Sequence, residues 1–162
     1  MQLSLFVSGP FQQELERIRV LVDPVQSALI PAHVTLCREE EVELLSSAAT
    51  PSKLEAESHL ALRFGAPKRC GSHGIILPCI DGEERYSQLR QRLLGPYAKR
   101  SEPHITMAHP RNPRASGNKL EAVTLALPAT VVFDRAVLIK QGAMNEAWQI
   151  IEEFRFSGRF HA

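Results

Sequence analysis

Apolar and polar positions follow the same order in two stretches of the chain. A short apolar run at residues 3–7 precedes a helical pattern at 11–22, and a second run at 75–80 precedes a helical pattern at 83–94. Short apolar runs between turn residues predict strands, and apolar residues three or four positions apart predict one buried helix face. The residues of the two helix faces are Leu15, Ile18 and Val22, then Tyr86, Leu89 and Leu93.

A four-residue string closes each stretch. His33-Val34-Thr35-Leu36 ends the first, and His104-Ile105-Thr106-Met107 ends the second, 71 residues later. Side chains of a strand alternate between its two faces, so the His and Thr of each string share a face and the apolar residues take the other. If the two strands lie side by side, two imidazoles and two hydroxyls converge on one pocket.

The repetition makes chance a poor explanation. The chain has only 6 His in 162 residues, and a shuffled chain of this composition would carry about 0.04 such strings. We therefore interpret residues 1–162 as one domain with an internal duplication, whose strand–helix–strand repeats lie near 3–36 and 75–107.

Downstream of each string the pattern continues. We expect helices at 39–49, 52–57 and 118–127, strands at 59–64 and 130–139, and a loop at 112–117. Residues 148–156 alternate like a half-buried strand after a Gln141-Gly142 turn, which predicts a hairpin with the preceding strand.

Charge and cysteine content narrow the class of protein. The net charge is +1, so the chain lacks the overall basic character of proteins that grip long nucleic-acid duplexes. Cys37, Cys70 and Cys79 are odd in number and form no C-x-x-C pair, and neither a secretory segment nor an apolar run near 18 residues is present. We expect a reduced, monomeric, cytoplasmic protein without a membrane segment.

Two other chemistries have to be weighed. Cys37 shares the predicted face of His33, but the second copy has Ala108 in its place, which argues against thiol catalysis. A metal would need three converging ligands, and neither string carries a carboxylate on its His/Thr face. The remaining histidines that could contribute to such a site are His59, His73 and His109. We expect no metal and no cofactor.

Paired imidazoles and hydroxyls suit phosphodiester chemistry. One histidine accepts a proton from water or a ribose hydroxyl while the other protonates the departing oxygen. The threonine hydroxyls donate to the non-bridging oxygens, where charge accumulates.

The two strings resemble the signature motifs of the 2H phosphoesterase superfamily, most of all its bacterial branch of 2'-5' RNA ligase-like proteins and RNA 2',3'-cyclic phosphodiesterases. The resemblance implies an α+β fold of two pseudo-symmetric lobes, each an antiparallel sheet with helices outside, and an active cleft between them. It also implies metal-independent cleavage of 2',3'-cyclic or 2'-5' phosphodiesters in nucleotides or RNA ends. His33 and His104 would be catalytic, and Thr35 and Thr106 would bind phosphate.

Two alternatives remain open: a module that binds RNA ends or nucleotide phosphates without turnover, and RNA 2'-5' ligase activity. The branch often carries an arginine soon after the second motif, where this chain has His109. Arg111 and Arg114 in the following loop, and Tyr97 in the turn before the motif, are our candidates for substrate contacts at the cleft mouth.

Overall fold

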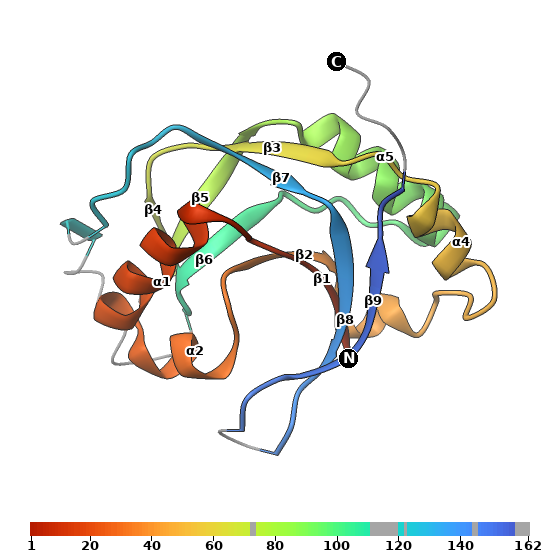
Figure 1. The fold of residues 1–162 in the computed structure, drawn as a ribbon, viewed down its shortest axis with the longest axis horizontal. Coiled ribbons are helices and arrows are strands. Elements are labelled where there is room, and N and C mark those ends of the chain that lie inside the picture. Colours follow the sequence, from red (N-terminus) through yellow and green to blue (C-terminus); the bar gives the residue numbers. More distant parts are fainter. Residues whose placement is uncertain (72–73, 111–119, 122, 144–145, 158–162) are drawn as a thin grey trace.

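Two antiparallel sheets form the framework of the computed structural model (Figure 1). The structure describes residues 1–71, 74–110, 120–121, 123–143 and 146–157. The first sheet has the order β2-β1-β8-β9, with β1 at Gln2–Phe6, β2 at His33–Cys37, β8 at Arg135–Lys140 and β9 at Gln149–Arg155. The predicted hairpin of the last two strands is confirmed.

The second sheet is built around β5, Gly74–Asp81. One edge of β5 pairs with β6, His104–Ala108. The rest of the sheet comprises β3 at Leu60–Phe64, β4 at Lys68–Cys70 and β7 at Ala129–Phe133. Each sheet and its helices make one lobe, which gives the predicted α+β fold.

Helices cover the outer sides of the sheets, with α1 and α2 at one end of the molecule and α4 and α5 at the other (Figure 1). Their bounds are α1 Pro10–Val22, α2 Pro24–Leu29, α3 Glu39–Val42, α4 Thr50–Glu55 and α5 Glu83–Leu94, with a 3-10 turn, η1, at Gly95–Tyr97. The predicted apolar faces of α1 and α5 are buried. Gly82 precedes α5 at φ +92°, and a Cβ there would lie 2.4 Å from the carbonyl oxygen of Ala61, so only glycine fits this turn.

The two strand–helix–strand units have matching registers. Phe6 pairs with His33 in the first, and Pro78 pairs with His104 in the second. In both units the register shifts directly after the threonine. Leu36 in β2 and Met107 in β6 are the residues that the pairing leaves out, which marks a bulge in each strand. The two units therefore share both the pairing of the histidine and the position of a bulge.

Three sequence predictions differ from the structure. The predicted strand 130–139 is two strands: β7 joins the second sheet and β8 the first, and Asp134 lies at the crossing. The predicted helix 39–49 ends after Val42, beyond which turns follow. Residues 123–127 of the predicted helix 118–127 are not helical, and the predicted loop 112–117 lies outside the described residues.

The strands that carry the motifs are edge strands stabilised from the opposite lobe. Among the described strands, β2 pairs only with β1 and β6 only with β5. From α5, the Tyr86 hydroxyl donates to the carbonyl oxygen of Thr35 at 2.7 Å, and Arg90 donates to that of Leu36. From the first lobe, Asp23 accepts from the backbone N–H of His109 at 2.8 Å. These bonds hold β2 and β6 against each other.

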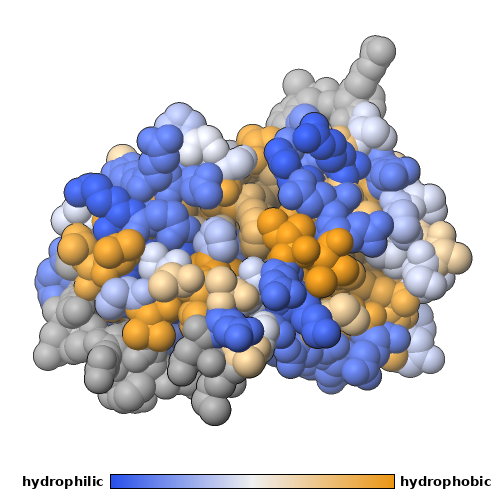
Figure 2. All heavy atoms as spheres, turned by 60° about the horizontal axis from the view of Figure 1, so that its bottom comes forward, coloured by the Kyte–Doolittle hydropathy of each residue, from blue (hydrophilic) through white to orange (hydrophobic). Residues whose placement is uncertain are grey.

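Most apolar side chains of both sheets and of the inner helix faces belong to a single core cluster. On the face in Figure 2, hydrophobic residues lie in separate groups among hydrophilic ones. No helix in the described part of the chain is long and apolar enough to cross a membrane.

Loss of the Tyr86 hydroxyl should weaken the junction between the lobes. Tyr86 is fully buried, so Tyr86→Phe should lower the free energy of unfolding by about 1–2 kcal/mol, as expected for one buried hydrogen bond. Urea unfolding measures this, with Tyr97→Phe as the control because Tyr97 is 63% exposed. Equal stability of the two variants would contradict a stabilising role for the bond.

Candidate active site

A cavity of about 440 Å³ opens between the lobes. Both lobes and the segment before β9 contribute to its lining, which consists of Gln2, Arg19, Gln26, Ile30, His33, Thr35, Arg38, Glu39, Glu40, Ser101, Glu102, His104, Thr106, His109, Gln141 and Trp148. The structure therefore brings together the four motif side chains that the sequence singled out.

Strand alternation explains this convergence. In β2, His33 and Thr35 are partly exposed to the cavity while Val34 and Leu36 are fully buried in the core. In β6, Ile105 and Met107 are likewise fully buried, and His104 and Thr106 face the same cavity. Each string thus supplies a polar face to the cavity and an apolar face to the core.

Both histidines are held through the same ring atom. His33 Nδ1 lies 2.8 Å from the carbonyl oxygen of Pro31, and His104 Nδ1 lies 2.9 Å from that of Glu102. A carbonyl oxygen only accepts hydrogen bonds, so Nδ1 carries a proton in each ring. Nε2 is then the atom of each imidazole that takes up or releases a proton.

The Thr35 hydroxyl is oriented by its neighbours. The Gln2 side-chain amide donates to Thr35 Oγ1 at 3.1 Å and to Ser4 Oγ at 2.7 Å. Because Oγ1 accepts from Gln2, its own O–H remains a donor for a ligand oxygen in the cavity.

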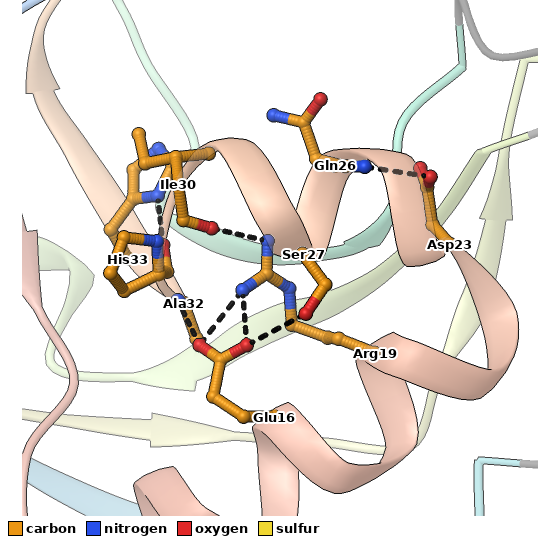
Figure 3. Close-up of polar contacts among 9 residues, drawn as sticks. Glu16, Arg19, Asp23, Gln26, Ser27, Ile30, Ala32 and His33 are labelled. Atoms are coloured by element: carbon orange, nitrogen blue, oxygen red, sulfur yellow. Dashed lines mark hydrogen bonds and ion pairs between the residues drawn. The ribbon is translucent and has the colours of Figure 1, made fainter. Parts of the chain in front are cut away.

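His33 rests on a polar network that rises from α1 (Figure 3). Arg19 forms two hydrogen bonds to Glu16, at 2.7 and 2.8 Å, and donates to the carbonyl oxygen of Ile30 at 2.9 Å. Removal of the His33 ring from bulk water in the cavity lowers its pKa to about 4, and the neighbouring Arg19 and His104 act in the same direction. The hydrogen bond to Pro31 opposes the shift.

The accessible charges of the cavity have both signs. Arg38 is exposed, whereas Arg19 is 1% exposed and paired with Glu16. Glu39, Glu40 and Glu102 also line the space. Among the described lining residues, Arg38 is therefore the accessible permanent cation.

Of the three additional substrate contacts suggested by the sequence, Tyr97 alone belongs to the described residues. Tyr97 lies in η1 and is not among the lining residues. Arg111 and Arg114 lie outside the described residues. His109 lines the cavity although it lies an odd number of residues after His104, because β6 ends at Ala108 and strand alternation no longer decides on which side this side chain lies.

Sequence reasoning missed two arginines that the 71-residue offset could have revealed. Arg38 follows His33 by five residues, as His109 follows His104, and both line the cavity. Arg19 precedes His33 by fourteen residues, as Arg90 precedes His104, and both arginines are buried. Trp148 was missed as well, because no repeat or motif marks it.

The described residues also bear on the two alternative chemistries, although His73 lies outside them. Cys37 is fully buried and does not line the cavity, and burial raises the pKa of its thiol to about 12, which disfavours the thiolate needed for nucleophilic attack. No group of three His, Cys, Asp or Glu side chains in the described part of the chain is arranged to hold a metal ion.

Comparison with proteins of known structure shows which fold the chain has. No family model and no curated protein sequence matches the chain. Solved structures of E. coli LigT do match: the complex with ATP at TM-score 0.62 and 17% identity, over 97% of this chain and 96% of LigT. The complex with 3'-AMP matches at TM-score 0.60 and 16% identity, over 97% of each chain. The apo form matches at TM-score 0.61 and 14% identity, over 97% and 96%.

These matches define the class of fold. LigT is a 2'-5' RNA ligase of the 2H phosphoesterase superfamily, and this chain has the two-lobed fold of LigT along nearly its whole length. The fold expected from the two His-x-Thr strings is thereby confirmed. At this level of sequence identity the likeness concerns the fold, and the activity has to be argued from the site.

Proposed function

We propose that this chain is a 2H phosphoesterase that cleaves 2',3'-cyclic or 2'-5' phosphodiesters of nucleotides or RNA ends without a metal ion. The observation that carries the proposal is the convergence of two Nδ1-anchored histidines and two threonines, from equivalent strands, on one cavity. We propose further that the protein acts as a cytoplasmic monomer on small nucleotides or RNA termini.

The arrangement suits in-line displacement at phosphorus. One Nε2 accepts a proton from water as the water oxygen bonds to phosphorus, and the bond from phosphorus to the leaving ribose oxygen breaks. The other Nε2 gives its proton to that oxygen. Thr35 and Thr106 donate to the non-bridging oxygens, whose charge rises in the transition state. Proton exchange with solvent restores both histidines.

Arg38 and Trp148 are our candidates for substrate recognition. A phosphodiester carries a permanent negative charge, and Arg38 is the accessible cation of the described lining. Trp148 is half-buried against a small apolar cluster and lines the cavity together with the amides of Gln26 and Gln141. An aromatic face beside amide groups suits a nucleobase, which stacks and forms hydrogen bonds.

A ligase is the second candidate. LigT shares this fold, and the same paired histidines can catalyse attack of an RNA 5' hydroxyl on a 2',3'-cyclic phosphate. One histidine accepts the proton of the 5' hydroxyl as its oxygen bonds to phosphorus, the bond from phosphorus to the 3' oxygen breaks, and the other histidine protonates that oxygen, which leaves a 2'-5' diester and a free 3' hydroxyl. Product analysis with 2'-5' dinucleotides, in both directions, separates the two activities.

Each histidine should be necessary for turnover. His33→Ala and His104→Ala should each lower kcat/KM for a 2',3'-cyclic nucleotide at least about 100-fold, the low end for losing a general acid or base. His59→Ala, which changes a histidine away from the cavity, should leave the rate unchanged. Activity should persist in excess chelator.

The outcomes distinguish the competing functions. Loss of activity with chelator and recovery with zinc would favour a metal mechanism. Binding of cyclic nucleotides, 2'-5' dinucleotides and cyclic-phosphate-ended RNA, with no product from any of them, would favour the binding module.

Removal of the Arg38 charge should weaken binding of the phosphate. Arg38→Gln should lower kcat/KM about tenfold or more, the cost expected for a charge-assisted hydrogen bond, and the effect should be larger at low salt. Arg17→Gln is the matched control because Arg17 is exposed on α1 and does not line the cavity. An equal effect in both variants would exclude a specific contact by Arg38.

Trp148 should act on the base rather than on the phosphate. Trp148→Ala should raise KM for a cyclic nucleotide roughly 5- to 100-fold, as expected for a lost stacking contact. It should leave hydrolysis of glycerol 1,2-cyclic phosphate, which has no base, unchanged. Tyr97→Ala is the control because Tyr97 does not line the cavity. A larger rise in KM for Tyr97→Ala than for Trp148→Ala would favour Tyr97, the residue expected from the sequence, as the substrate contact.

A further inference from the structure

The sheet faces beside the two motifs are covered to different extents. Directly opposite residues of neighbouring strands share a face of their sheet. Ser4 of β1 is opposite both Thr35 of β2 and Val137 of β8, so these three residues lie on the cavity side of the first sheet. Val137 is only 1% exposed there, because Ile30 and Trp148 pack in the same small apolar cluster. This face of the first sheet is therefore covered.

The corresponding face of the second sheet is exposed. Thr106 of β6 is opposite Ile76 of β5, and Ile76 is opposite Lys68 of β4, so the three form one row across the sheet, the Lys68 row. Pro78 is opposite His104 in the neighbouring row. Ile76 and Pro78 are partly exposed, and Lys68 is exposed. The motif residues of β6 thus continue into a surface that solvent reaches.

Apolar side chains extend this surface towards β7. Ile80 follows Pro78 on the same face of β5 and is 56% exposed. It lies over Gly65, where a Cβ would be 2.8 Å from Ile80 Cγ2, so the glycine leaves room for the isoleucine. Val132 of β7 is opposite Ala61 of β3 and is 42% exposed. Large apolar side chains gathered on one exposed sheet face indicate a contact surface.

Two cations border these apolar residues. Arg63 lies on the exposed face of β3, and Lys68 ends the row that begins at Thr106. Both are exposed, and neither forms an ion pair with another described residue. Asp81, the strand partner of Arg63, accepts a hydrogen bond from the N–H of Gly82 at 2.9 Å. The two positive charges are therefore available to an anion.

The first lobe presents mostly negative charge at the cavity. Glu39 and Glu40, at the start of α3, are exposed and line the cavity beside Arg38. Glu102 lies before His104, on the other side of that histidine from the Lys68 row. A chain of phosphates that leaves the cavity meets carboxylates over α3 and cations across the second sheet. Electrostatic attraction therefore favours the path across the second sheet.

We propose that this face of the second sheet binds the RNA strand that precedes a terminal 2',3'-cyclic phosphate. The inference rests on the proposed function and makes RNA ends, rather than free mononucleotides, the preferred substrates. The strand leaves the cavity along the Lys68 row, in which two strand spacings, about 10 Å, separate Thr106 from Lys68. Its phosphates contact Lys68 and Arg63, and its bases lie against Ile80 and the neighbouring apolar side chains.

The chemistry of the surface favours RNA over a protein segment. A single RNA strand combines phosphates, which cations attract, with unstacked base faces, which gain from contact with side chains. An arginine guanidinium also stacks on a base, and Arg63 is available for this contact. The surface is continuous with two residues of a site proposed for phosphodiesters, His104 and Thr106.

The dependence of turnover on chain length tests the proposal. The wild-type protein should have a higher kcat/KM for an RNA tetranucleotide that ends in a 2',3'-cyclic phosphate than for the cyclic mononucleotide with the same terminal base. Arg63→Gln with Lys68→Gln should lower the ratio of the two kcat/KM values about 3- to 30-fold at low salt, as expected for two exposed charge contacts. Equal kcat/KM values in the wild type would overturn the proposal and favour a protein partner for this surface.

A second double variant controls for net charge. Arg17→Gln with Lys53→Gln removes the same charge from exposed positions on α1 and α4, away from the cavity and the second sheet. It should leave the ratio unchanged. An equal fall of the ratio in both double variants would overturn the proposal, because the effect would then come from the overall charge.

The apolar part of the surface has its own variant. Ile80→Ser should lower the same ratio about fivefold, as expected for loss of the apolar area that the strand would cover. Ile151→Ser on β9 is the matched control, because Ile151 is 51% exposed and lies on the other sheet. An equal effect of the two substitutions would exclude contact between the strand and Ile80.

Binding of a tetranucleotide that ends in a 3'-phosphate needs no turnover. The slope of the logarithm of its association constant against the logarithm of salt concentration, measured by fluorescence anisotropy, should become shallower by about 1.4 in Arg63→Gln with Lys68→Gln, about 0.7 for each lost phosphate contact. This change without turnover of any substrate would sink the proposed function and leave the RNA surface standing. Turnover of cyclic phosphates with an unchanged slope would leave the proposed function standing and overturn the RNA surface.

Discussion

The structure depends on how two edge strands satisfy their outer backbone groups. β2 and β6 carry the motifs, and each has a hydrogen-bonded partner strand on one side only. Unpaired buried backbone groups are costly, and here Tyr86 and Arg90 bond to β2 while Asp23 bonds to the end of β6. Because each lobe completes the strand of the other, the lobes cannot separate without exposing these groups.

The junction also explains why charged side chains are buried so near the cavity. Arg90 and Glu41 are each 3% exposed, and a buried ion pair is a weak source of stability because both partners lose their hydration. Its additional bonds to Leu36 and Lys99 connect the end of β2 with the segment before His104. We interpret the role of this ion pair as positional: it fixes where the two motif strands lie relative to each other.

The helices and the faces of single strands could be predicted from the sequence, but the partner of each strand in the sheets could not. The spacing of Leu15 and Ile18 is enough to predict α1 and its buried face, and alternation in the His-x-Thr strings predicts which side chains share a face. Periodicity gives no partner for a strand, so the crossing at Asp134, where one apolar stretch is divided between two sheets, was not predictable. Trp148 reaches the cavity through the same long-range pairing, because β9 lies beside β8.

Internal duplication places a physical requirement on a site that moves protons. Two equivalent strings supply two equivalent imidazoles, yet a displacement at phosphorus needs one histidine to accept a proton and the other to donate one. The asymmetry has to come from positions where the repeats have diverged. At this cavity the repeats differ beyond the threonines, where Arg38 of the first repeat corresponds to His109 of the second. The repeats thus keep the four His and Thr side chains of the cavity alike, while this diverged position places an arginine beside one string and a histidine beside the other.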